Sequence, residues 1–185
     1  METGRLIVLT GPSGVGKGTL LKSLLSRHPG LYLSVSATTR ISRVGEINGQ
    51  HYCFVDRKQF ENMIATGELL EWAEFAGNYY GTPKLPVIQR IEQGKSVMLE
   101  IELEGARQIR QSFPNALLIF ILPPSLKELE CRLRSRGLDS EDGIVRRLRR
   151  APEEINAASE FNAQIVNDDL ETALNQLELV LQQGI

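Results

Sequence analysis

The stretch that decides the fold is a strand pattern, Leu6-Ile7-Val8-Leu9-Thr10, followed at once by Gly11-Pro12-Ser13-Gly14-Val15-Gly16-Lys17-Gly18-Thr19. The apolar run predicts a strand buried on both faces of a parallel sheet. Residues 19–25 carry leucines on one side and predict a helix. Glycines allow backbone N–H groups to approach a phosphate, the helix adds its positive end, and Lys17 adds a mobile charge. This order predicts a phosphate-binding loop and disfavours the alternative, a glycine-rich turn with a solvated lysine.

The loop departs from the usual pattern at one position. Ser or Thr normally follows the lysine and can bind magnesium through its hydroxyl. Here Gly18 takes that place, and the hydroxyl comes one residue later, at Thr19. The sequence therefore leaves open whether protein or water contacts a metal at this loop.

Outward from the loop, strand and helix patterns alternate. Further strands are expected over residues 31–35, 69–75, 96–101, 116–122 and 165–166, and a helix over 103–112. Capping boxes at Asp56–Gln59 and Ser125–Glu128 predict two helix starts, and Thr82-Pro83 predicts another, with Pro at the first helical position. The alternation predicts an α/β fold with a parallel sheet, interrupted by an inserted subdomain over about 36–80.

Composition excludes several protein classes. The 185 residues are 42% hydrophobic and 24% charged, with a formal net charge of -2. This is one soluble domain by the length prior, too apolar to be disordered and not basic enough to coat nucleic acid. Cys53 and Cys131 lie far apart without a nearby His cluster, which argues against a disulfide framework or zinc site. With no long apolar run, a reduced cytoplasmic enzyme without a membrane span is expected.

A second group of polar residues points to a nucleotide base and another phosphate. Arg40 and Arg43 lie three apart in a hydroxyl-rich loop and can hold a phosphate by fork-shaped hydrogen bonds; the alternative is a solvated basic loop. Glu71 lies within an apolar stretch, where a carboxylate needs a partner. Guanine offers adjacent N1–H and N2–H2 donors, which adenine lacks; the alternative is a surface acid on an edge strand. Tyr52 is either a ligand or a core phenol with one hydrogen bond.

Seven arginines lie between Arg132 and Arg150, on both sides of an acidic connection over residues 139–142. A run of this kind is usually a solvated helix face. The acidic, glycine-containing connection instead favours a mobile lid that carries positive charge. No role as a base is assigned to His28 or His51.

Several motifs together resemble the guanylate kinase family. They are Gly-Pro-Ser-Gly-x-Gly-Lys, Ser36-Ala-Thr-Thr-Arg40, Gly45-Glu-x-Asn-Gly49, Glu71-Trp72, Asn78-Tyr-Tyr-Gly81, Arg132-x-x-x-Arg136-Gly137 and Val166-Asn-Asp-Asp169. The resemblance runs from about Leu6 to Leu181. It implies a P-loop kinase fold: a parallel-sheet core (about 1–35, 82–136 and 158–185), a GMP-binding subdomain (about 36–81) and a helical lid (about 137–157).

The resemblance also implies roles for individual residues. For ATP binding they are Gly11, Pro12, Ser13, Gly14, Val15, Gly16, Lys17, Gly18, Thr19 and Asn167. For GMP binding they are Ser36, Arg40, Arg43, Tyr52, Glu71, Tyr80, Thr82 and Glu102. For catalysis they are Lys17, Arg132, Arg136 and Arg147, whereas Arg134, Arg149 and Arg150 are expected to be surface residues. Glu102 stands where the family usually has aspartate, so the metal ligand is left open between Thr19 and Glu102, directly or through water.

The implied activity is in-line transfer of the γ-phosphoryl group of ATP, with Mg²⁺, to GMP. The acceptor phosphate is already anionic, so the enzyme must align, neutralise charge and exclude water rather than supply a nucleophile. Two alternatives are a small kinase for another phosphorylated acceptor and a catalytically inactive module that binds a protein partner. The phosphate loop, complete apart from Gly18, argues against the second. Oligomeric state and use of dGMP are not predicted by the sequence.

Overall fold

The computed structural model describes residues 4–75, 77–137 and 140–183. The chain divides into two compact units, one formed by Met1–Val8 and Gly30–Ala116 and the other by Leu9–Pro29 and Leu117–Ile185. Strand β1 (Leu6–Thr10) contributes to both, because the division falls between Val8 and Leu9. The strand order is β2-β7-β1 in the first unit and β1-β8-β9 in the second.

The first unit holds the start of the parallel sheet. Strand β2 (Tyr32–Leu33) pairs in parallel with β7 (Val97–Glu100), and Tyr32 lies opposite Val97. Val97, Met98 and Leu99 are buried, as the apolar run predicted. Helices α3 (Lys84–Glu92) and α4 (Leu103–Ser112) precede and follow β7, and α4 has the bounds expected from the sequence.

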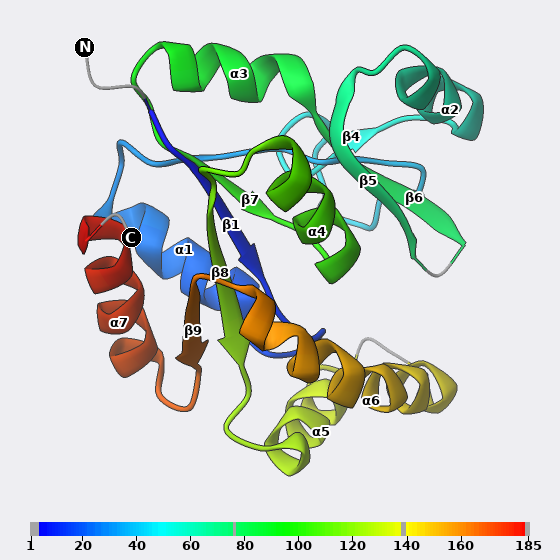
Figure 1. Ribbon diagram of the computed structural model, residues 1–185. Helices are drawn as coiled ribbons and strands as arrows, with labels where there is room; N and C mark the ends of the chain where they lie inside the picture. Colours follow the sequence, from blue (N-terminus) through cyan, green and yellow to red (C-terminus); the bar gives the residue numbers. More distant parts are fainter. Residues whose placement is uncertain (1–3, 76, 138–139, 184–185) are drawn as a thin grey trace. The chain divides into compact units, whose positions relative to one another are not determined.

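The inserted segment of the first unit builds a second sheet, in the order β4-β3-β6-β5. Its strands are β3 (Ala37–Thr38), β4 (Cys53–Phe54), β5 (Leu69–Phe75) and β6 (Asn78–Pro83), with helix α2 (Arg57–Ala65) between β4 and β5. Strands β5 and β6 are antiparallel neighbours and lie side by side in Figure 1. Phe60 of α2 is fully buried and stacks on the ring of Tyr79 from β6.

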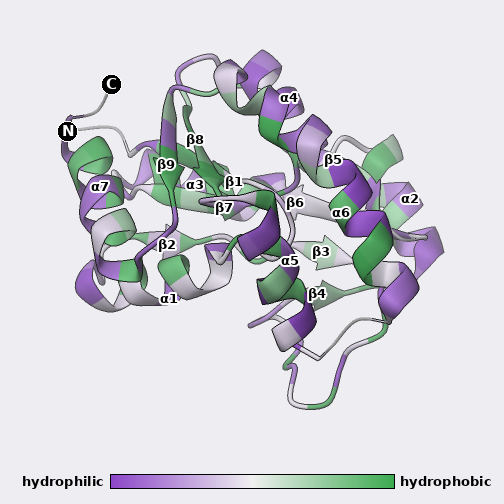
Figure 2. Ribbon diagram, turned by 90° about the horizontal axis from the view of Figure 1, so that it is seen from below, coloured by the Kyte–Doolittle hydropathy of each residue, from purple (hydrophilic) through white to green (hydrophobic). Residues whose placement is uncertain are grey.

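The second unit also contains parallel strands. Strand β8 (Leu117–Leu122), drawn mostly in green in Figure 2, is buried along nearly its whole length and pairs in parallel with β9 (Ala163–Val166). Helices α1 (Lys17–Arg27) and α7 (Leu170–Gln183) lie side by side in Figure 1. The remaining elements are α5 (Leu126–Ser135), α6 (Glu141–Asn156) and the short helix η1 (Ala157–Glu160).

The helix starts differ from the predicted caps in two places. Asp56 forms a complete capping box with Gln59, whereas Ser125 accepts from the Glu128 N–H as a simple N-cap. The prediction that Thr82 caps α3 with Pro83 at the first helical position is wrong. Pro83 is itself the N-cap, and Thr82 lies in β6 with its hydroxyl donated to Glu71.

The α/β fold with a parallel-sheet core is confirmed. Within the described ranges, no helix combines the length and apolar character that crossing a membrane requires.

Candidate active site

The glycine-rich loop connects β1 to α1, as the sequence predicted. The Val15 N–H donates to the Pro12 carbonyl, which closes a tight turn, and the Leu20 N–H donates to Gly16 at the start of the helix. Gly16 has φ 100°, and a Cβ there would lie 2.4 Å from Nδ2 of Asn167. Only glycine fits this position, both for its backbone conformation and for the close approach of Asn167.

Lys17 lies over the loop that precedes it. Its Nζ donates to the Gly11 carbonyl at 2.6 Å and to the Pro12 carbonyl at 3.3 Å. The first turn of α1 contains no acidic residue, so no carboxylate there opposes the positive end of the helix. The loop thus combines backbone donors, a helix N-terminus and an ammonium group, which together suit a polyphosphate.

Two further residues of the second unit are anchored to this loop. Asn167, buried at the end of β9, donates from Nδ2 to the Val15 carbonyl at 2.8 Å. Arg132 of α5 donates from Nη1 to the Asn167 carbonyl at 2.8 Å, and its Nε donates to Glu128 at 2.9 Å. The guanidinium is therefore held against the loop by partners on both sides.

The arginines of α5 and α6 have different surroundings. Arg147 of α6 donates to the Ser13 hydroxyl of the loop, so it joins Lys17 and Arg132 there. Arg136 follows α5 and its side chain is exposed. Arg134 is paired with Glu130 and Glu141 at the surface. Arg149 and Arg150 are also exposed.

The residues with candidate magnesium oxygens differ in exposure. Gly18 and Thr19 are both exposed in the first turn of α1, and a Cβ at Gly18 would meet no atom within 4 Å. Glu102 is half-buried at the N-cap of α4 in the first unit. Among the residues described, no group of three or more His, Cys, Asp and Glu side chains could hold a metal ion by itself.

Glu71 of β5 is the buried acid of the first unit. It is 5% exposed and lies opposite Thr82 of β6, which is fully buried. The Thr82 hydroxyl donates to Oε1 of Glu71 at 2.6 Å. The sequence predicted that this carboxylate needs a partner, and the Thr82 hydroxyl is one such partner. The alternative, that Glu71 is a surface acid, is wrong.

The environment of Glu71 changes its acidity. Burial raises the pKa of Glu71 to about 7, since desolvation disfavours the charged form. Hydrogen bonds from the Thr82 side chain and main chain oppose this rise, and the nearby Glu102 carboxylate adds to it. A ligand that donates hydrogen bonds to this carboxylate would favour the ionised form.

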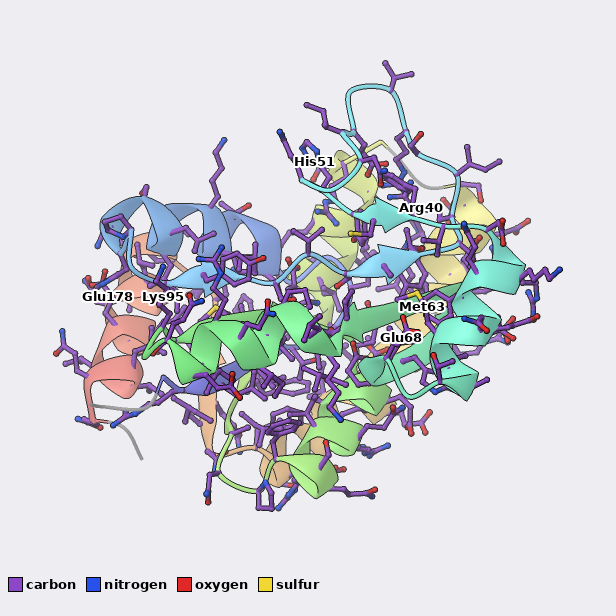
Figure 3. All side chains as sticks on the ribbon, turned by 90° about the horizontal axis from the view of Figure 1, so that it is seen from above. Arg40, His51, Met63, Glu68, Lys95 and Glu178 are labelled. Carbon is purple, nitrogen blue, oxygen red and sulfur yellow. The ribbon has the colours of Figure 1, made fainter. Side chains whose placement is uncertain are left out.

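The Arg40 guanidinium lies at the base of the loop after β3 (Figure 3) and is paired with Glu46. Its carbon Cζ lies 5.3 Å from the centroid of the Tyr52 ring, and Tyr52 meets Tyr80 edge to face. The structure therefore brings Arg40, Tyr52 and Tyr80 together, a cation beside two phenols. Arg43 is exposed, and its main-chain N–H donates to Glu46 at 2.7 Å. Ser36 is half-buried immediately before β3.

Sequence reasoning assigned no role to three residues near these side chains: Glu46, Gly105 and Gln108. Glu46 pairs with Arg40, Gly105 lies against the Glu71 carboxylate, and Gln108 binds the main chain of Trp72. Glu46 lies inside the motif Gly45-Glu-x-Asn-Gly49, but the sequence does not indicate that it pairs with Arg40. Gly105 is a glycine inside a predicted helix, which costs stability relative to alanine, but the sequence does not indicate what it contacts. Gln108 gave no signal in the sequence.

Comparison with known proteins agrees with the resemblance. A sequence model of the guanylate kinase family matches residues 3–184. The guanylate kinase of Trichormus variabilis is 66% identical over 97% of this chain and 90% of its own length. That of Trichodesmium erythraeum is 64% identical over 98% of this chain and 97% of its own. A crystal structure of guanylate kinase from Anaplasma phagocytophilum superposes with a TM-score of 0.82 at 33% identity, covering 98% of this chain and 86% of that one.

Proposed function

Because the chain belongs to the guanylate kinase family, we infer that it transfers the γ-phosphoryl group of ATP to GMP, giving ADP and GDP. Two guanylate kinases that are more than 60% identical to this chain match nearly its whole length, so the comparison applies to the whole chain. The protein is an enzyme, and its substrates are ATP and GMP.

The observation that carries the choice of guanine is the buried carboxylate of Glu71. An acid that is 5% exposed has few ways to recover its lost hydration. Thr82 supplies hydrogen bonds from one side. The N1–H and N2–H2 donors of guanine match two carboxylate oxygens, whereas adenine presents no such pair. Glu71 and Thr82 together therefore favour guanine, and Ser36 and Glu102 are proposed as further base contacts.

The acceptor phosphate is assigned to Arg40, Arg43, Tyr52 and Tyr80. Three of these, Arg40, Tyr52 and Tyr80, already lie together. Planar guanidinium groups bind a phosphate through two parallel hydrogen bonds, and the phenols add single donors. This set holds the GMP phosphate so that its oxygen attacks in line, without a protein base.

The donor phosphates are assigned to the loop from Gly11 to Thr19. Lys17, Arg132 and Arg147 surround this loop and are proposed to stabilise charge on the transferring group, with Arg136 joining them from the end of α5. Asn167 is proposed to lie beside the adenine. The division into core, GMP-binding region (about 36–81) and lid (about 137–157) is likewise proposed, with lid closure excluding water.

The oxygen donors fit magnesium that arrives with ATP. Mg²⁺ prefers oxygen ligands, keeps several waters and is commonly bound through substrate phosphates with one or two protein groups. The exposed Thr19 hydroxyl beside the loop, or the Glu102 carboxylate, would supply such a group, directly or through water. When bound, the ion would neutralise part of the charge on the ATP phosphates. The cytoplasmic location expected from the sequence stays a prediction.

Replacing Glu71 by Gln tests the guanine assignment. One carboxylate oxygen becomes a donor that opposes the guanine N–H groups, so the KM for GMP should rise by about a hundredfold. The KM for ATP should change little. Glu74→Gln, an exposed change three residues along the same strand, is the matched control. Unchanged KM for GMP in a folded Glu71→Gln variant would show that another residue selects the base.

A further inference from the structure

Helix α4 meets the carboxylate of Glu71 at a glycine. Gly105 is buried, and a Cβ built on it would lie 2.2 Å from Oε2 of Glu71 and 2.9 Å from its Cδ. Real Cβ atoms do not approach other atoms this closely. The carboxylate therefore rests against the backbone of α4, in space that any side chain at residue 105 would fill.

The backbone itself does not require glycine at this position. Gly105 lies within the first turn of α4 and is absent from the described glycines with positive φ. Glycine inside a helix costs about 1 kcal/mol relative to alanine. The close approach of Glu71 is the feature that explains glycine here.

One turn further along α4, Gln108 fixes the strand that carries Glu71. Its Nε2 donates to the Trp72 carbonyl at 2.7 Å, and its Oε1 accepts from the Trp72 N–H at 3.1 Å. Strand β5 lies at the edge of its sheet, so Gln108 satisfies main-chain groups that a neighbouring strand would otherwise pair. This clamp acts on the residue directly after Glu71.

The two contacts and the Thr82 hydroxyl define where the carboxylate lies. Thr82 binds Oε1 from β6, while Oε2 faces Gly105. The carboxylate thus has a partner on one side and a backbone surface on the other.

We propose that Gly105 and Gln108 are positioning residues for guanine recognition: Gly105 leaves the space in which the Glu71 carboxylate lies, and Gln108 holds β5 at that place. The proposal rests on the proposed function of Glu71. It assigns part of the base specificity to a helix without requiring either residue to touch the base.

Gly105→Ala tests the first contact. The added methyl should displace the carboxylate and lower kcat/KM for GMP by about tenfold or more, while the KM for ATP stays within about twofold. Gly30→Ala is the matched control, since a Cβ at Gly30 meets no atom within 4 Å. An unchanged kcat/KM for GMP in folded Gly105→Ala would overturn the assignment.

A double-variant cycle separates positioning from a general structural effect. In a Glu71→Ala background the displaced carboxylate is gone, so adding Gly105→Ala should change kcat/KM for GMP by less than about twofold. If Gly105→Ala is too unstable to assay, the same cycle uses the melting temperature, which Glu71→Ala should restore. Persistence of the full effect, on activity or melting temperature, in that background would contradict the proposal.

Gln108→Ala tests the second contact, with the exposed Gln111→Ala of the same helix as control. We expect a selective rise in the KM for GMP, and an equal effect on both substrates would overturn the role of Gln108. Calorimetric titration of GMP into the parent chain distinguishes failure of the proposed function from failure of the positioning role. A parent that neither binds nor uses GMP contradicts the proposed function, whereas an active parent with insensitive variants contradicts only the positioning role.

Discussion

Glu46 binds the end of the Arg40 guanidinium through both of its carboxylate oxygens. Nη2 of Arg40 donates to Oε1 at 2.8 Å, and Nη1 donates to Oε2 at 3.0 Å. Both side chains are mostly buried, with 15% and 17% exposed. Because Glu46 accepts from both terminal nitrogens, it fixes the orientation of the guanidinium.

Glu46→Ala should therefore raise the KM for GMP by several-fold, since Arg40 loses its orientation. The hydrogen bond from Arg40 lowers the pKa of Glu46 to about 2, so the pair is ionised throughout the working range. Its stabilising contribution is present above the ordinary carboxyl pKa and is lost only as pH falls toward 2. The effect on KM should accordingly be constant between pH 6 and 8.

The matched control for that substitution is Glu61→Ala, which removes an exposed pair with Arg57 on α2. Steady-state kinetics with GMP varied at saturating ATP provide the measurement. Equal KM values for GMP in Glu46→Ala and Glu61→Ala would show that Glu46 has no role in GMP binding.

Glu71 predicts a dependence of stability on pH with the opposite sign. Its pKa is raised in the folded chain to about 7, so ionisation opposes folding, and this cost grows as pH rises from about 4.5 to 7. Glu71→Gln removes the cost and should stabilise the ligand-free protein by about 3 kcal/mol at pH 8, with little gain below pH 4.5. Thermal unfolding of both proteins across this pH range measures the difference in their stability. A stability difference that does not grow as pH rises would contradict a buried Glu71 with a raised pKa.

Arg132 and Arg134 lie on the same helix, so substitution of Arg134 is the control for substitution of Arg132. Arg132 is anchored to the phosphate loop and to Asn167, whereas Arg134 pairs with surface acids. Arg132→Ala should lower kcat by at least about a hundredfold through loss of charge stabilisation. Arg134→Ala should leave kcat within about twofold, because exposed ion pairs contribute little. Similar losses in both variants would mean that helix α5 acts through its stability alone.

Gly18→Ser tests the departure in the phosphate loop. A Cβ at this position would meet no atom within 4 Å, and Gly18 is exposed, so serine is accommodated. It restores a hydroxyl directly after Lys17 and should lower the magnesium concentration that gives half-maximal activity. Gly18→Ala adds the side chain without the hydroxyl and isolates its effect. If serine and alanine shift the magnesium midpoint equally, the hydroxyl does not contact the ion.

The fold and the position of the glycine-rich loop could be predicted because their signals are local. The apolar runs around Val8 and Ile119 predict buried strands, and the glycines before Lys17 predict the loop. Glu71 was predicted to need a partner because its neighbour Leu70 is apolar. These inferences use only residues adjacent in the chain.

The contacts that hold the site together could not be predicted, because they join distant residues. Gly105 meets Glu71 only after α4 packs on β5, and nothing near Gly105 in sequence indicates that contact. Arg132 finds the carbonyl of Asn167 across 35 residues. Thr82 looked like a helix cap because its hydroxyl has the right chemistry, but the buried Glu71 competes for that hydroxyl and binds it.

Phosphoryl transfer from ATP to GMP is tested most directly by formation of ADP from magnesium-ATP, measured in parallel with GMP, AMP, CMP and UMP as acceptors. Lys17→Ala provides the negative control, after its fold is verified by thermal unfolding. We expect turnover with GMP alone and its loss in the Lys17→Ala variant. Absence of turnover with GMP in a folded chain, or equal turnover with AMP, would contradict this expectation.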